Sequence, residues 1–472
     1  MCLIAAGLVV LASFVVVGIF ARNENIYVRY PQLNLSISKL TIPICLITSV
    51  SQIISVFIFF VIIFAGFFGS SNPVYNIAPT MVWVIWWVGI AYVSAFVGDI
   101  WSILNPWKIL FEWVEKLVQQ LNISLPLGPI AKYPSDFGIW PALMLLLIFA
   151  WIENVYPDAI LPLRISQMIL IYSGITWIGM IIFGKNVWLR NGEAFSLVFG
   201  FLAKFSPLEM RSRSIGSHSA DVLGEPLRSE HDRSEQCDTS SNTDVSDIRE
   251  VIVRPFGTGL LNVGSGSTTH MYFVLVLLAS VTFDGFTATV PWMDIQTLLL
   301  EKLASPTLIN TLGLLATVMI FMSTYLFFCL LMRLVSNTNV TAMDLANRFV
   351  YTLIPIALAY HVAHFLVFLL IQGQLIIPLA SDPFGFGWDI FGSENYRLNF
   401  NIVAPTFYWA TSVVAIVIGH IIAVFLAHSI ALRLGKTRGE AVRSQFPMLV
   451  LMVGYTVASL WIITQPMYIS NM

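Results

Sequence analysis

Residues 349–371 read FVYTLIPIALAYHVAHFLVFLLI, a stretch without a single Lys, Arg, Asp or Glu. A run of about 18 apolar residues or more is long enough to cross the hydrocarbon core of a bilayer as a helix. The whole chain has this character, because 57% of its 472 residues are hydrophobic and only 11% are charged. A soluble domain carries roughly 25% charged residues. The sequence therefore excludes a soluble globular protein.

Comparable apolar stretches recur along the chain and predict an all-α, polytopic transmembrane helix bundle of about ten spans. The predicted spans are residues 2–21, 42–68, 78–98, 138–153, 160–184, 269–287, 307–332, 349–371, 403–430 and 446–465. The fourth is short, so the count ranges from nine to eleven. The first lacks a basic leading region and a cleavage site, and we interpret it as a span rather than a signal peptide.

The basic residues predict the orientation of the bundle. Loops after the odd-numbered spans hold 21 of the 24 Lys and Arg residues, and cytoplasmic loops are enriched in these residues. We therefore expect both termini to lie outside the cytoplasm. The net charge of −2 provides no basic field for nucleic acid. The expected partners are the lipid bilayer and other subunits of a membrane complex.

Three regions follow from this pattern. Residues 1–207 are predicted to hold spans one to five and two interfacial helices on the cytoplasmic side, WSILNPWKILFEWVEKLVQQL (101–121) and NGEAFSLVFGFLAKF (191–205). Residues 208–268 form a polar cytoplasmic loop, largely disordered because its segment 208–249 has few large apolar residues to bury. Residues 269–472 hold spans six to ten with a long outer loop at 372–402.

A few ionisable side chains fall inside the predicted spans, where they are costly and indicate a functional site. His361 and His364 lie in span eight, His420 in span nine and Asp284 near the outer end of span six. The spacing of three residues places His361 and His364 on one helical face. These four residues are the predicted metal ligands.

Several chemistries fit this set. Imidazoles and a carboxylate suit a divalent transition metal such as zinc, copper or iron. Two histidines on facing helices could instead hold haem b. A proton relay or a substrate cavity uses the same residues, and simple interhelical hydrogen bonding needs no ligand at all.

The outer loop at 372–402 is longer than two helices require, which is typical of a lid or binding surface. An ordered plug is the alternative. The residues predicted to contact a substrate or form the lid are Tyr360, Gln372, Gln374, Asp382, Trp388 and Asp389.

Several runs resemble the fenitrothion hydrolase-like family of bacterial integral membrane proteins. They are NPWKILFEW, GEAFSLVFGFLAKFSPLE, VRPFGTGLL, FDGFTAT, YHVAHFLVFLLIQGQ, SDPFGFGWDIFG, GHIIAVFLAHSIAL and QFPMLVLMVGYTVASLWIITQP. The resemblance covers the chain from near residue 105 to its end. It implies a multi-pass protein of the bacterial inner membrane, in a family named after cleavage of an organophosphorus triester. All four predicted metal ligands fall inside matching runs.

Three functions remain open at this stage. Metal-assisted hydrolysis of an apolar phosphoester would use a metal-bound water as the nucleophile, but the chain has no HExxH, GxSxG or P-loop motif. A transporter would pass metal ions or protons along the same histidines. An accessory subunit of a membrane complex, with or without haem, is the third hypothesis. Whether the chain is an enzyme stays open.

Overall fold

The structure is a computed structural model. It describes residues 32–36, 41–123, 129–213, 248–263, 266–336, 340–434 and 438–465, together with residues 7 and 15. Within this part of the chain nine helices are long and apolar enough to cross a membrane. Each coincides with a predicted span, so the all-α polytopic bundle is confirmed. The predicted first span, 2–21, lies outside the described residues except for residues 7 and 15.

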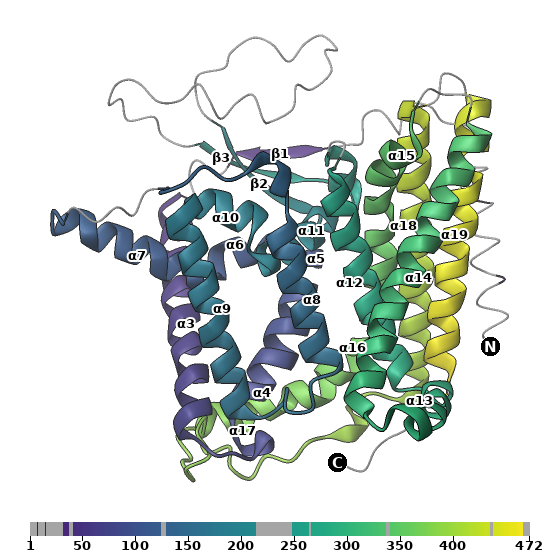
Figure 1. Ribbon diagram of the computed structural model, residues 1–472. Helices are drawn as coiled ribbons and strands as arrows, with labels where there is room; N and C mark the ends of the chain where they lie inside the picture. The colour runs from purple at the N-terminus through teal and green to yellow at the C-terminus, as the bar shows by residue number, and fades with distance from the viewer. Residues whose placement is uncertain are drawn as a thin grey trace.

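The helices of the bundle are named as in Figure 1. The first half contains α3 (Thr41–Phe68), then α4 (Ile77–Pro79), η2 (Thr80–Ile90) and α5 (Ala91–Phe96) as one span, then α8 (Trp140–Asn154) and α9 (Pro162–Phe183). The second half contains α12 (Thr268–Thr287), α14 (Pro306–Val335), α18 (Pro405–Leu434) and α19 (Arg438–Thr464). Between α14 and α18 lies one long span built of five consecutive elements: α15 (Ala342–Phe349), η6 (Val350–Leu353), α16 (Ile354–Gln372), η7 (Gly373–Leu375) and α17 (Ile376–Ser381). Shorter segments are η1 (Pro73–Tyr75), α6 (Trp101–Leu104), α7 (Pro106–Gln120), η3 (Ser135–Phe137), α10 (Lys185–Asn191), α11 (Ala194–Phe205), η5 (Thr258–Asn262), α13 (Val290–Leu303) and η8 (Phe400–Ile402).

Helix α16 occupies the centre of the bundle. It packs against α18, α12, α19, α11 and the π-helix η2, so it joins the two halves of the chain. Figure 1 shows a small sheet, α10 and α15 at one end of the bundle, which we call the sheet end, and α13 and α17 at the other, which we call the α17 end. Because α16 contacts both halves, polar side chains on it meet residues from distant parts of the sequence.

Two expected surface helices behave differently. Helix α7 projects sideways from the bundle (Figure 1) and leaves Trp113, Val114 and Leu117 exposed, as an interfacial helix would. Helix α11 was also expected at the surface, yet Phe195, Phe199 and most of its other residues are buried. Its sequence is apolar on nearly every side, so it packs inside the sheet end rather than on it. At the α17 end α13 is a further short helix that the sequence analysis did not predict.

The expectation of disorder for 208–249 is wrong at both ends of that segment. Strands β2 (Leu208–Arg213) and β3 (Ile248–Val253) pair antiparallel, and β1 (Leu33–Ser36) pairs with the other edge of β3. The sheet order is β1-β3-β2. Ile252 of β3 is buried. The composition of 208–249 did not predict this strand pairing, because most of the apolar residues of β3 follow that segment. Residues 214–247 lie outside the described part.

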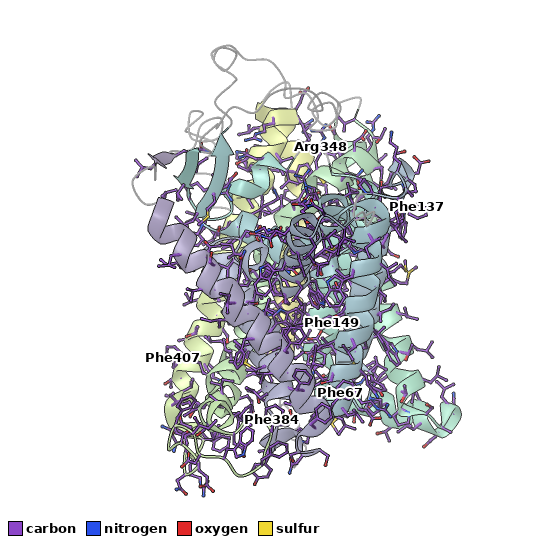
Figure 2. The ribbon with its side chains drawn as sticks, turned by 90° about the vertical axis from the view of Figure 1, so that its left-hand side faces the viewer. Phe67, Phe137, Phe149, Arg348, Phe384 and Phe407 are labelled. Atoms are coloured by element: carbon purple, nitrogen blue, oxygen red, sulfur yellow. The ribbon has the colours of Figure 1, made fainter. Side chains whose placement is uncertain are left out.

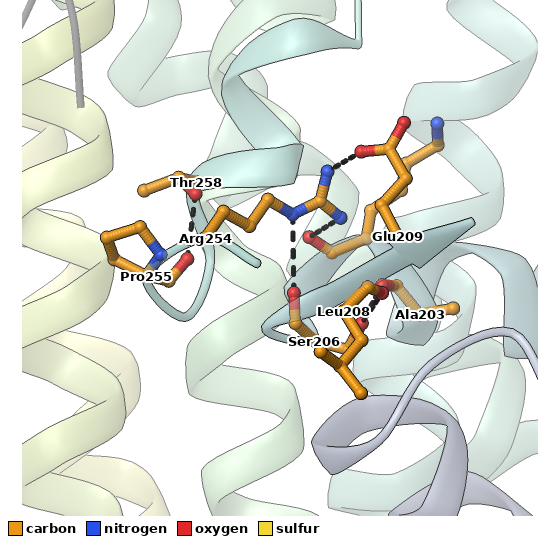
Figure 3. A network of polar contacts seen from close by, with 8 residues as sticks. Ala203, Ser206, Leu208, Glu209, Arg254, Pro255 and Thr258 are labelled. Atoms are coloured by element: carbon orange, nitrogen blue, oxygen red, sulfur yellow. Dashed lines mark hydrogen bonds and ion pairs between the residues drawn. The ribbon is translucent and has the colours of Figure 1, made fainter. Parts of the chain in front are cut away.

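A buried arginine attaches this sheet to the bundle (Figure 3). Arg254, which follows β3, forms an ion pair with Glu209 of β2. Its guanidinium also donates to the carbonyl oxygens of Ser206 and Lys204, both at 3.3 Å. Gly259 leaves the space for it, since a Cβ there would lie 2.2 Å from Arg254 Nη2. The end of α11, the sheet and η5 are thereby fixed together.

Candidate functional site

The central polar contact of the bundle joins Asp284 of α12 to His364 of α16. His364 Nε2 lies 2.9 Å from Asp284 Oδ2. Both side chains are largely enclosed, with exposed fractions of 12% for His364 and 26% for Asp284. Asp284 is three residues from the last residue of α12, which places the contact in the half of the bundle nearer the α17 end. Two of the four predicted ligands therefore meet.

Unpaired polar atoms surround this contact. Tyr360 stacks on the His364 ring at 5.9 Å between ring centroids, and its own hydroxyl has no hydrogen-bond partner in the described part of the chain. Gly285 makes room for that hydroxyl, because a Cβ on it would lie 1.9 Å from the Tyr360 oxygen. His364 Nδ1 is also buried and has no hydrogen-bond partner among the residues that the structure describes. Buried polar atoms are normally hydrogen-bonded, so such a group of exceptions needs an explanation.

A second carboxylate, which the sequence analysis did not select, adjoins the site. Glu153 at the end of α8 lies close enough to Asp284 for their charges to interact. The indole of Trp87 donates to Glu153 Oε1 at 2.6 Å, and this is the single hydrogen bond that the described residues give to its side chain. The sequence does contain one signal for Glu153. An acidic residue in the last turn of a helix interacts unfavourably with the helix dipole, so its presence there indicates a role other than helix stability.

The element that carries Trp87 is itself unusual. Residues Thr80–Ile90 form a π-helix, whereas π-helical geometry normally occupies a single turn and often marks functional sites. Trp87 is 4% exposed and packs edge-on against Phe149 of α8 at 4.5 Å. The wider π-helical turn thus sets the indole beside the end of α8. Nothing in the hydropathy of TMVWVIWWVGI distinguishes it from an ordinary apolar helix.

The other two predicted ligands face other partners. His361 packs edge-on against Tyr92 of α5 at 5.3 Å, and its carbonyl oxygen accepts from the Tyr92 hydroxyl at 3.1 Å. The Nδ1 atom of His361 has no hydrogen-bond partner among the described residues. His420 of α18 instead contacts α19, where its Nδ1 lies 3.0 Å from Thr456 Oγ1. His428 makes a similar contact with Gln445. The structure therefore does not bring His361, His364 and His420 together at one point.

The positions of the His, Cys, Asp and Glu side chains bear on the metal ion or haem expected from the sequence. Among the described residues no group of three His, Cys, Asp or Glu side chains is placed to hold a metal ion. Catalytic zinc sites use three protein ligands, and only the Asp284–His364 pair is in contact here. Metal and haem binding stay predictions.

The predicted lid residues organise their own loop. Asp382 accepts four backbone N–H groups, from Gly385, Phe386, Gly387 and Trp388, at 2.6–3.1 Å. Gln374 is equally committed: its oxygen accepts from the Tyr396 hydroxyl and the Asn399 amide, and its nitrogen donates to the carbonyls of Leu370 and Asn399. This geometry favours the ordered plug over a substrate-binding lid.

The remaining lid candidates agree with this description. Asp389 accepts from Ser381 Oγ and the Glu394 amide, both at 3.1 Å. Gln372 is half-buried at the end of α16, and Trp388 is exposed. Of the six candidates, Tyr360 is the one that lies beside Asp284 and His364.

A third buried carboxylate lies toward the sheet end. Glu193 is fully buried and accepts five hydrogen bonds: from the Phe195 and Ser196 amides, Ser196 Oγ, the Tyr172 hydroxyl and Asn105 Nδ2. Through these bonds it caps α11 and ties it to α9 and to the start of α7. The pattern is that of a fixed structural charge.

Comparison with family models, with curated proteins and with solved structures finds no match to this chain. The resemblance to the fenitrothion hydrolase-like family stays a prediction. Function is therefore argued from the geometry of the site.

Proposed function

We propose that the chain is a proton-conducting membrane protein in which Glu153, Asp284 and His364 exchange protons. The observation that carries the proposal is the hydrogen bond between His364 Nε2 and Asp284 Oδ2, with His364 Nδ1 left unpaired. An imidazole bonded in this way can accept a proton on one nitrogen and release one from the other. The unpaired Tyr360 hydroxyl beside it provides a place for the next water molecule of a relay.

The second carboxylate supports the same chemistry. Two carboxylates that share a site repel each other as charges, and sharing a proton relieves the repulsion. Glu153 and Asp284 each have one hydrogen-bond donor among the described residues, although an ionised carboxylate has about four acceptor positions. This shortage makes a full charge on both groups costly inside an apolar bundle. Under this proposal the pair holds a single mobile proton.

Membrane placement gives the proposed path its direction. The basic loops that the sequence assigns to the cytoplasm adjoin α7, α10, β3 and the end of α18 that leads into α19, and Figure 1 shows these elements toward the sheet end. We infer that this end faces the cytoplasm of a bacterial inner membrane and that both termini lie outside it. The proton-exchange site then lies nearer the outer surface.

Proton flux into liposomes tests the proposal. Purified protein is reconstituted with an entrapped pH-sensitive dye, and a potassium diffusion potential drives proton entry. Asp284→Asn and His364→Gln should slow acidification at least tenfold, to the rate of empty liposomes. Asp294→Asn is the matched control, because Asp294 is exposed on α13 at the same end of the bundle, and it should keep the full rate.

The opposite results are equally clear. Wild-type protein that conducts no protons, or full flux in both site variants, would overturn the proposal. If the histidines and Asp284 only join helices, these substitutions lower stability by around 1 kcal/mol and leave the flux unchanged.

A further inference from the structure

The outer loop has a rigid first half. Asp382 binds four successive amides, and Gly385 and Gly387 take the positive φ values of +72° and +83° that close the turn around its carboxylate. The following residues are fixed as well, because the Phe391 amide donates to Ser381 Oγ at 2.8 Å. The side chains of this segment are therefore held in place rather than folded back at random.

What this rigid segment displays is apolar. Phe386, Trp388, Ile390 and Phe391 are 54%, 44%, 61% and 72% exposed, and we call these four residues the apolar ridge. Phe386 and Trp388 also stack with Phe384 at 5.4 and 5.7 Å. A protein surface in water rarely shows so many large apolar side chains in succession, and such a patch marks an interaction surface.

No charged side chain belongs to the apolar ridge, and exposed charged residues follow it directly. The two carboxylates within the segment, Asp382 and Asp389, are both occupied with backbone amides. Beyond the ridge Glu394 and Arg397 are exposed. The loop is thus divided into an apolar part and a polar part, as in segments that lie at a membrane interface.

The ridge also continues a surface that faces lipid. Phe60, Phe64 and Phe68 stack at 6.2 Å steps along α3 and are all exposed on this spanning helix. At the end of α3 the Ser70 amide donates to the Phe384 carbonyl at 2.7 Å. Figure 2 shows Phe67 of α3 and Phe384 of the loop at the same end of the bundle, opposite Arg348. The apolar surface of α3 therefore passes directly into the loop.

We infer that the apolar ridge inserts into the headgroup region of the leaflet at the α17 end and anchors the outer loop to lipid. Aromatic side chains are enriched at this depth of a membrane. Since Gln374 at the end of α16 binds the same loop through Tyr396 and Asn399, the anchor also holds the outer end of the helix that carries His364. The inference does not depend on the proposed proton chemistry.

Site-directed spin labelling in lipid nanodiscs tests the depth of the ridge. A nitroxide is attached to Phe391→Cys, in protein with Cys2, Cys45 and Cys237 replaced by Ala; Cys329 is fully buried and stays. Collisions with apolar oxygen and with a water-soluble nickel complex report lipid and water. The Phe391→Cys label should favour oxygen at least threefold over the control label at Glu394→Cys, which should favour nickel. Ile390→Cys replaces Phe391→Cys if that variant does not fold.

Two results would overturn the inference. Equal access to nickel at both positions would place the ridge in water, free for a protein on the outer side. Protection of the Phe391→Cys label from both reagents would show that protein, such as a second copy of the chain, covers the ridge.

Discussion

The bundle contains two carboxylate centres that differ in how fully they are hydrogen-bonded. Glu193, toward the sheet end, accepts five hydrogen bonds. Glu153 and Asp284, toward the α17 end, accept one each from the described residues, Glu153 from Trp87 and Asp284 from His364. Hydrogen bonds to an ionised carboxylate stabilise the charged form. Glu193 therefore has the hydrogen bonds that a buried carboxylate needs, whereas Glu153 and Asp284 lack most of them, as the proposed proton exchange requires.

The two centres also differ in the tyrosine beside each carboxylate. Tyr172, beside Glu193, donates its hydroxyl at 2.5 Å. Among the described residues neither the Tyr360 hydroxyl nor His364 Nδ1, both beside Asp284, has a hydrogen-bond partner. A purely structural centre gains from satisfying every donor and acceptor. The centre with open positions is the one that can admit water or a proton.

The largest effect is expected from Glu193→Ala. The substitution leaves four of the five donors without an acceptor, since Asn105 Nδ2 also donates to Ser196 Oγ at 3.3 Å, and each unsatisfied buried group costs about 1–3 kcal/mol. We expect the free energy of unfolding to fall by at least about 3 kcal/mol, measured by chemical unfolding in detergent micelles.

Glu115→Ala is the matched control for this loss. Glu115 of α7 pairs with Lys185 at 2.7 Å in a partly exposed position, where ion pairs contribute about 1 kcal/mol or less. Equal stability of the two variants would remove the distinction between the centres, since Glu193 would then be no more structural than a surface residue.

A smaller effect is expected for the hydrogen bond between Trp87 and Glu153, whose strength depends on whether the carboxyl group is charged. The coupling energy between Trp87 and Glu153 is measured with Trp87→Phe, Glu153→Leu and the double variant. A hydrogen bond to a neutral group contributes about 0.5–1.5 kcal/mol and one to a charged group about 1.5–3 kcal/mol. The proposed sharing of a proton leads us to expect the lower range. A coupling near 3 kcal/mol would show that Glu153 is fully ionised and would contradict proton sharing.

The sequence predicted the architecture well because membrane insertion depends on a local property. Length and hydropathy located all nine described spans, including α8, whose short apolar run left the predicted number of spans between nine and eleven. The ends of elements were harder. Glu153 appeared to lie at the edge of its span, and the structure continues α8 to Asn154, so Glu153 is a half-buried residue of the helix rather than a boundary residue.

The site was predicted only in part, because the sequence does not fix the rotation of each helix about its own axis. Hydropathy does not fix how a helix is turned about its axis when its buried and lipid-facing sides are both apolar. Asp284 and His364 turned out to face each other, but His420 faces Thr456 of α19. The π-helix that carries Trp87, the buried end of α11 and the strand pairing of β3 depend on contacts between distant segments, and no local pattern encodes them.

The smallest effect is expected from metal removal. A centre with three ligands would bind zinc tightly, and a ligand at about 1,000 times its dissociation constant stabilises the folded state by about 4 kcal/mol. The Asp284–His364 pair alone supplies two ligands, so we expect a chelator to leave the melting temperature of purified protein unchanged, with less than one metal ion per chain by elemental analysis. Stoichiometric zinc or copper, lost from His364→Gln together with several degrees of melting temperature, would contradict this. It would mean that His361 or His420 turns toward Asp284 when metal is present, and the open positions of this centre would then belong to a metal ion rather than to a proton.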